Sequence, residues 1–306
     1  MKKHRQLLLA LLTMLLWGSL FPTVKLGFSA YGVSGTADIL LFAGIRFFIS
    51  GIVICSFAAV RDKAGFAPVK GSIGLILLSG LVAFVLHHGF YYAGLESTAS
   101  SKTALIKQIG ALVYVCFSFL FIKEDRPTRQ KILGAWIGFL GIVALNLSKE
   151  GLGFSLGDGL ILCASFCTVF SNVISKKVFA KVSPITATGI SQLFGGAVLL
   201  AAGLVMGGEV SFDSRIWIMA YICAASVVSY CIWFGIVKTG ELSKLFIIKF
   251  AEPVFACIFG ALILGENIWK WQYLAAFTLI STGILISNQK PKAPPCRKGR
   301  RQSRSN

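Results

Sequence analysis

The amino-acid sequence predicts an all-α integral membrane protein with ten transmembrane helices, arranged as two inverted repeats of five helices. Three observations lead to this prediction: an apolar composition, ten long apolar segments with basic residues in alternate loops, and an internal repeat. Of the 306 residues, 56% are hydrophobic and 14% are charged, whereas about 25% charged residues are usual in a soluble domain. This composition excludes a disordered chain, a disulfide scaffold and almost every class of water-soluble enzyme.

Ten segments are long and apolar enough to be transmembrane helices, since a bilayer crossing takes about 20 apolar residues. We predict these helices at residues 7–28, 36–60, 71–93, 99–122, 130–147, 156–179, 185–207, 214–237, 243–264 and 271–288. They divide into two domains, 7–147 and 156–288, with an N-terminal segment at 1–6 and a tail at 289–306. The first apolar run is too long for a signal peptide, so we expect it to be retained. The tail is basic and rich in proline, and we expect it to be disordered.

Basic residues are concentrated in alternate loops, which sets the orientation of the predicted helices. One set of loops and the N-terminal segment carry Lys2, Lys3, Arg5, Arg61, Lys63, Lys70, Lys123, Arg126, Arg129, Lys131, Lys176, Lys177, Lys181 and Lys238. The other set of loops carries only Lys149, Arg215 and Lys270. Because basic loops stay in the cytoplasm, we place both termini there. We attribute the net charge of +18 to this topology and expect no nucleic-acid partner.

Motifs for other chemistries are missing from the sequence. Most of the eight cysteines lie inside apolar segments and no CxxC pair occurs, so no metal or disulfide site is predicted. No GxxxxGKS, GxxxxGKT or HExxH motif is present. We therefore expect no cofactor and no enzymatic activity. An intramembrane enzyme stays a remote alternative, because Glu252, His87 and His88 could perform acid–base chemistry.

An internal repeat relates the two predicted domains. The segment that starts at residue 92 aligns without a gap, at an offset of 142, with the segment that starts at residue 234. Identical pairs are Ser101/Ser243, Lys102/Lys244, Ile106/Ile248, Lys107/Lys249, Phe117/Phe259, Leu120/Leu262, Glu124/Glu266, Gln130/Gln272, Gly141/Gly283, Ile142/Ile284 and Asn146/Asn288. Chance matches in apolar sequence would favour leucine, isoleucine and phenylalanine, whereas these pairs include lysine, glutamate, glutamine and asparagine.

The repeat predicts two units of five helices, and because five is odd the second unit would lie inverted in the membrane. The charge pattern agrees, since it places Glu124 inside and Glu266 outside. Inverted repeats that meet near the midplane are typical of secondary transporters, in which they permit two exchanged conformations. The sequence therefore predicts gradient-driven transport by alternating access.

Four motifs occur along the chain in a characteristic order and spacing. They are Trp17-Gly18 followed by Lys25, Arg46-Phe47-Phe48, the glycine-rich run Gly134, Gly138 and Gly141, and Glu252-Pro253-Val254 followed by Leu264-Gly265-Glu266. Together with the ten-helix repeat, they resemble the drug/metabolite transporter superfamily, EamA type. The resemblance implies a central cavity between two halves and efflux or exchange of small metabolites.

One position departs from the pattern of that family. The fourth helix of the family usually carries a proline where this chain has Ala111, the repeat partner of Pro253. We therefore expect the helix at 99–122 to be straighter than the helix at 243–264, and the two gates to be unequal.

Two lysines deep inside predicted helices are the main candidates for a substrate site. A charge near the bilayer centre costs about 2.5–3.5 kcal/mol, so it needs a partner or a wet cavity. Lys107 and its repeat partner Lys249 lie about 12 Å and about 9 Å into their helices, from opposite faces. Such a pair suits a carboxylate or a phosphate. The alternative is internal neutralisation, which Glu252 at i+3 offers to Lys249. Lys107 has no such local acid.

Glu252 and the adjacent histidines are candidates for coupling transport to protons. Glu252 could carry a proton, bind an amine of the substrate, or form a static ion pair. His87 and His88 titrate near physiological pH and could relay protons. Adjacent residues on a helix point about 100° apart, so we expect at most one histidine to face the cavity. A buried, hydrogen-bonded histidine is the alternative.

Aromatic residues and one arginine are further candidates for the predicted site. Trp17 and Tyr91 are candidates for the lining, whereas Tyr230, Trp233 and most other aromatic residues are interpreted as interfacial belts. For Arg46, helix-packing ion pairing is the alternative to substrate contact.

Proline and glycine set the predicted helix geometry. Pro22 and Pro253 interrupt their helices, and both lie where a gating helix would bend. Gly134 and Gly138 permit close helix packing, which we expect inside the monomer, and a homodimer stays open.

The sequence thus predicts a multi-pass transporter in a lipid bilayer, compatible with a bacterial inner membrane. It would export or exchange a small anionic or zwitterionic metabolite, such as an amino acid or organic acid, with coupling to protons. Three alternatives stay open: an exporter of lipophilic cations with the same fold, an importer, and a non-transporting membrane receptor or enzyme.

Overall fold

The structure, a computed structural model, describes residues 3–61, 69–95, 100–145, 155–212, 215–265 and 271–289. Its helices are α1 (Lys3–Ala30), α2 (Gly35–Arg61), α3 (Ile73–Gly80), η2 (Leu81–Leu86), α4 (His87–Leu95), α5 (Ser100–Phe121), α6 (Arg129–Leu145), α7 (Leu156–Val178), α8 (Pro184–Val205), α9 (Trp217–Thr239), α10 (Leu242–Ile248), η3 (Lys249–Ala251), α11 (Glu252–Leu264) and α12 (Trp271–Asn288). All regular structure in the described ranges is helical, which confirms the all-α prediction. The predicted tail lies outside these ranges except for Gln289.

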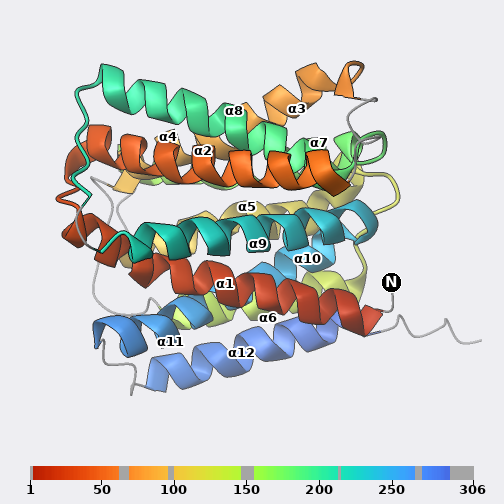
Figure 1. Cartoon of the computed structure of the whole chain (residues 1–306). Helices are drawn as coiled ribbons and strands as arrows, with labels where there is room; N and C mark the ends of the chain where they lie inside the picture. Colours follow the sequence, from red (N-terminus) through yellow and green to blue (C-terminus); the bar gives the residue numbers. More distant parts are fainter. Residues whose placement is uncertain are drawn as a thin grey trace, which may run out of the picture.

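The helices run side by side as a bundle, with α2 and α8 along one side and α6 and α12 along the opposite side (Figure 1). Each of the ten predicted segments coincides with one helix or with a run of consecutive helices. Within the described residues, seven of these are long and apolar enough to cross a membrane: α1, α2, the run from α3 to α4, α7, α8, α9 and the run from α10 to α11. In α5 the apolar stretch Ile106–Phe121 is shorter.

Two of the predicted helices are interrupted and a third is bent. The run from α3 to α4 contains the π-helical segment η2, and the run from α10 to α11 contains the 3₁₀ segment η3. The helix α5 passes Ala111 without a break, as expected from the missing proline, but it bends at Phe117, where φ is −117° and ψ is 22°. The helix α5 and the run from α10 to α11 therefore differ, although α5 is not straight. π-Helical segments are frequent at functional sites, and η2 directly precedes His87.

The two prolines differ in their effect on the helices. Pro253 lies in the first turn of α11, directly after η3, as the predicted interruption requires. Pro22 lies inside the continuous helix α1, so the interruption predicted there is absent. The carbonyl four residues before a proline loses its helical partner, but neighbouring helices allow such sites in membranes. Here that residue is Gly18, and a Cβ added to it would lie 2.5 Å from Phe255 Cβ on α11.

Glycines hold the outer helix pairs close together. A Cβ added to Gly134 on α6 would lie 2.5 Å from the Gly283 carbonyl oxygen on α12, and one added to Gly138 would lie 2.6 Å from the Phe250 ring. Both glycines of the GxxxG motif therefore pack within the monomer, as expected. The main buried apolar cluster lies between these outer pairs and includes residues of α1, α5, α9, α10 and α12.

Replacing Gly134 by alanine is expected to destabilise the folded protein by about 1–3 kcal/mol, because the new methyl group would push α12 away. Gly74→Ala is the matched control, since nothing lies within 4 Å of a Cβ at that exposed helical position. Thermal unfolding in detergent measures both variants. Equal unfolding temperatures for the two alanine variants would contradict the packing described here.

Candidate functional site

An ion pair joins the two predicted domains in the middle of the bundle. Lys107 on α5 places its Nζ 3.5 Å from Oε1 of Glu252, the first residue of α11. Both side chains are largely buried, with 18% and 7% of their surface exposed. Lys107 has no acid nearby along its own helix, and the fold supplies one from a distant part of the chain. Lys107 also lies over the rings of Phe21 and Tyr91, at 4.9 and 5.4 Å from their centres.

Lys249 is surrounded by aromatic rings instead of carboxylates. Its Nζ lies 5.2 Å from the ring centre of Trp17 and 5.9 Å from that of Trp233. These distances fall within the range of favourable cation–π contacts. Among the residues that the structure describes, no carboxylate lies within the 4.0 Å limit of an ion pair with Lys249. The i+3 pair with Glu252, considered as the alternative to a substrate role, is not formed, because Lys249 extends toward α1 and α9 while Glu252 pairs with Lys107.

The cluster has an excess of positive charge and unused polar atoms. It contains two lysines but one carboxylate, that of Glu252, which pairs with Lys107. Oε2 of Glu252 and Nε1 of Trp17 are buried and have no hydrogen-bond partner within the described residues. A buried polar atom without a partner costs about 1–3 kcal/mol, so such atoms are usually satisfied by water or by a ligand. One unpaired acceptor and one unpaired donor therefore lie in the same group as the two lysines.

A small pocket lies beside this cluster. Its lining consists of Lys107, Gln108, Ala111, Ser165, Thr168, Val169, Phe246 and Lys249. At the position of the first half that corresponds to Glu252, the chain has a glycine, Gly110, because α7 packs directly against it. The amide of Gly110, the repeat partner of Glu252, donates to Ser165 Oγ at 2.9 Å, and a Cβ there would lie 2.5 Å from the same oxygen.

The two histidines lie on different sides of α4. His87 Nδ1 lies 2.9 Å from the Ala164 carbonyl oxygen and 3.2 Å from Thr168 Oγ1, and its ring stacks on Tyr91. His87 is within electrostatic range of Lys107, Lys249 and Glu252. His88 Nδ1 instead contacts the Phe84 carbonyl oxygen at 2.9 Å, and its ring packs on Phe47 and Tyr92. His87 therefore lies on the side of α4 that faces α7, whereas His88 faces Phe47 and is within electrostatic range of Lys107.

Arg46 lies in a second polar group that includes His88. Its Nε donates to Ser226 Oγ at 2.8 Å, and its guanidinium lies 4.8 Å from the Phe47 ring centre. The ion pair considered for Arg46 is not formed among the described residues, since a hydroxyl group and a ring take the place of the acid. His88 and Tyr230 are within electrostatic range of Arg46.

Sequence reasoning missed part of the aromatic lining. The prediction of an interfacial belt includes Trp233, but this residue is 1% exposed and its Nε1 donates to Asn172 Oδ1 at 2.7 Å. Tyr230 packs edge-on against Trp17, with ring centres 5.5 Å apart. The belt interpretation is wrong for both residues, because their rings face α1 inside the bundle. Their place on α9, opposite Trp17, could not be read from a single sequence.

Comparison with known proteins identifies the family. A model of the EamA-like transporter family matches the chain twice, at residues 4–147 and 155–289. The chain belongs to the EamA-like transporter family. Together with the long apolar helices, this membership makes it a multi-pass membrane protein of a transporter family.

Similar proteins carry names of the same kind. "Uncharacterized transporter sll0355" of Synechocystis sp. is 28% identical over 90% of this chain and 87% of its own length. "Uncharacterized inner membrane transporter YedA" of Escherichia coli K12 is 24% identical over 92% of each chain. A solved structure titled "Crystal structure of protein" has the same fold, with a TM-score of 0.76 at 20% identity over 94% of this chain and 97% of its own.

Proposed function

We propose that this protein is a secondary active transporter for a small anionic or zwitterionic metabolite, such as an amino acid or an organic acid. It exports or exchanges that metabolite by alternating access, with coupling to protons. Ten helices cross the membrane as two inverted halves, and both termini are cytoplasmic. The observation that carries this proposal is the buried cluster of Lys107, Lys249 and Glu252, in which Glu252 pairs with Lys107 while Lys249 lies over the Trp17 ring.

The charge balance of the cluster favours an anionic group on the substrate. A carboxylate placed between Lys107 and Lys249 would neutralise the excess charge and accept a hydrogen bond from Trp17 Nε1. On a zwitterion, an ammonium group could donate to the unused Oε2 of Glu252. The low dielectric of the site strengthens such contacts relative to water.

Packing of the repeat-related helices supports inverted halves. The helices α2 and α8 are extensively packed against each other, and so are α6 and α12. Each pair consists of helices that occupy the same position in the two predicted halves. Such pairing of equivalent helices is what a pseudo-twofold axis in the membrane plane would produce.

In this mechanism, the segment about which the halves move lies next to Lys249 and Glu252. The segment η3 breaks the helix at Lys249–Ala251, so the break contains Lys249, directly precedes Glu252 and is followed by Pro253. Rocking of the halves about this break, and about Pro22 on α1, would expose the lysine cluster to one side at a time. A proton on Glu252 or on His87 would then change the charge that the substrate meets.

Uptake into proteoliposomes tests this function. Purified protein is assayed with radiolabelled amino acids, organic acids and cationic dyes, with and without a pH gradient. We expect flux of at least one carboxylate-bearing compound, stimulated by the gradient. Protein-free vesicles and vesicles at equal pH are the controls, and no flux of any anion or zwitterion would contradict the proposal.

A second candidate is export of lipophilic cations, favoured by the aromatic rings of Trp17, Phe21, Tyr230 and Trp233 around a single buried acid. Cationic rings and ammonium groups bind to such aromatic faces. The two lysines oppose it, because they would repel a cation. Gradient-driven flux of the dyes alone would favour this candidate over the metabolite transporter.

A further inference from the structure

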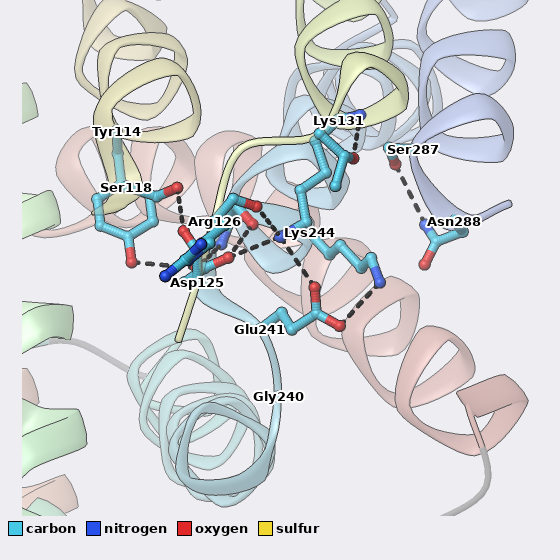
Figure 2. A network of polar contacts seen from close by, with 12 residues as sticks. Tyr114, Ser118, Asp125, Arg126, Lys131, Gly240, Glu241, Lys244, Ser287 and Asn288 are labelled. Carbon is cyan, nitrogen blue, oxygen red and sulfur yellow. Dashed lines mark hydrogen bonds and ion pairs between the residues drawn. The ribbon is translucent and has the colours of Figure 1, made fainter. Parts of the chain in front are cut away.

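A further polar network, separate from the lysine cluster and from the group around Arg46, lies at the end of the bundle where the chain begins. There the loop between α5 and α6 meets the start of α10 (Figure 2). Gln6 near the start of α1 donates to Thr239 at the end of α9, at 3.1 Å, which places the N-terminus at the same end. By the distribution of basic residues, this end faces the cytoplasm.

Asp125 is the centre of this network and is 2% exposed. Its carboxylate accepts hydrogen bonds from the Ser243 amide at 2.8 Å and from Ser243 Oγ at 2.5 Å. It also accepts from Lys131 Nζ at 2.8 Å and from Tyr114 OH at 3.2 Å. One buried carboxylate of the first half thus holds the first turn of α10 in the second half.

Lys131 extends the network to a second acid. Its Nζ lies 2.9 Å from Glu241 Oε2, and Glu241 Oε1 lies 2.9 Å from Lys244 Nζ (Figure 2). Burial alone would raise the pKa of Glu241, but hydrogen bonds from Lys244 and Lys131 outweigh it and hold that pKa below its ordinary value. We call the group of Asp125, Lys131, Glu241 and Ser243 the latch.

The latch is connected to the candidate site through a short piece of helix. The helix α10 runs from Leu242 to Ile248, and the next residue is Lys249. Contacts that hold the first turn of α10 in place therefore also constrain the positions of Lys249 and of Glu252, three residues later. Contacts of α10 with α5, α6 and α12 keep this connection inside the bundle.

The sequence does not repeat the charges of the latch at the corresponding positions of the other half. At the repeat offset, Asp125 corresponds to Asn267, Lys131 to Tyr273 and Glu241 to Ala99, although Ser243 corresponds to Ser101. Neutral residues thus replace both acids and the bridging lysine. The sequence therefore makes the two ends chemically unequal at the positions that form the latch.

We propose that Asp125 is a positioning residue that holds the cytoplasmic end of the transport pathway closed and biases the protein toward the state open to the opposite side. This inference rests on the proposed transport function. Opening at the cytoplasmic end would separate Asp125 from Ser243 and Lys131 from Glu241. Asp125 and Lys131 both belong to the first half and would stay paired with each other, and Glu241 would keep Lys244, so opening breaks the contacts between the halves without leaving a charge unpaired.

Labelling of a cysteine in the pocket tests the proposal without any substrate. Thr168→Cys, in a chain with its native cysteines replaced, reports access to the site through its reaction rate with a membrane-impermeant maleimide. The reagent is added from either side of oriented vesicles. We expect Asp125→Asn to raise the rate from the cytoplasmic side about tenfold and to lower it from the other side, as a shift between two states requires.

Glu124→Gln is the matched control, because Glu124 is the neighbouring acid, is exposed, and takes no part in the latch. Ser243→Ala keeps every charge and removes one donor, so it is expected to give a smaller shift in the same direction. If Asp125→Asn does not fold, Ser243→Ala tests the proposal in its place.

Unchanged labelling from both sides in the folded latch variants would overturn the proposal. A rise from both sides alike would also overturn it, because general loosening of the bundle would then be the cause. The readout needs no transported compound, so its failure is distinct from failure of the metabolite assay.

Discussion

Replacing Lys107 by alanine is expected to reduce substrate flux about 100-fold or more, with folded protein still present. The variant loses a charge that the substrate carboxylate would meet, and it leaves Glu252 without its 3.5 Å partner. Truncating one side of a buried, hydrogen-bonded charge pair costs about 2–5 kcal/mol in binding, which corresponds to this loss. The measurement is initial uptake into proteoliposomes, normalised to the amount of monodisperse protein reconstituted.

Two further variants separate the loss of binding from the loss of folding. Lys238→Ala removes an exposed lysine at the end of α9 and is expected to transport normally. Lys107→Ala combined with Glu252→Gln removes the stranded carboxylate, so it should recover the unfolding temperature without recovering flux. Unimpaired flux in Lys107→Ala would remove this lysine from the substrate site.

Replacing Glu252 by glutamine is expected to abolish the response of transport to a pH gradient. Glutamine has nearly the same shape but cannot take up or release a proton, so the variant would lack the proposed carrier. Exchange of labelled for unlabelled substrate at equal pH needs no net proton movement and is expected to continue at a measurable rate. Comparing gradient-driven uptake with exchange in the same vesicles measures the two effects separately.

His87→Gln provides the comparison for that experiment, since His87 is a second titratable group within electrostatic range of both lysines and of Glu252. The mechanism assigns the proton to one of these two residues. Loss of the gradient response in His87→Gln alone would assign the proton to the histidine. An intact response in both variants would contradict proton coupling at this site.

Hydropathy was sufficient to predict the helices, because a long apolar segment in a membrane must satisfy its own backbone hydrogen bonds and therefore folds as a helix. Each predicted segment coincides with helix in the structure. The interior of those helices was harder to predict. The π-helical turn at Leu81–Leu86 contains no proline or glycine, although Gly80 precedes it, and the bend at Phe117 occurs without either residue. Pro22 did carry such a mark, yet α1 continues through it.

The charged centre of the candidate site was predictable, because lysine and glutamate inside an apolar helix are costly enough to stand out. Its pairing was not predictable. The gapless repeat relates Lys107 to Lys249 but does not say which of them reaches Glu252, since that depends on side-chain direction across helices. The lining by Trp233 was hidden among many aromatic residues. The contacts of Asp125 were not predictable either, because the charges of its loop indicated only the orientation of the helices in the membrane.

The most direct test of the central claim, recognition of a carboxylate by the lysine cluster, is a binding measurement with a matched pair of ligands. The substrate from the flux assay and its methyl ester are titrated into purified protein, with unfolding temperature as a second readout. A ligand at 100 times its Kd stabilises the folded state by about 2.7 kcal/mol. We expect the acid to bind and stabilise, the ester to bind at least about tenfold more weakly, and Lys107→Ala to lose this preference. Equal binding of acid and ester by the wild-type protein would contradict the account.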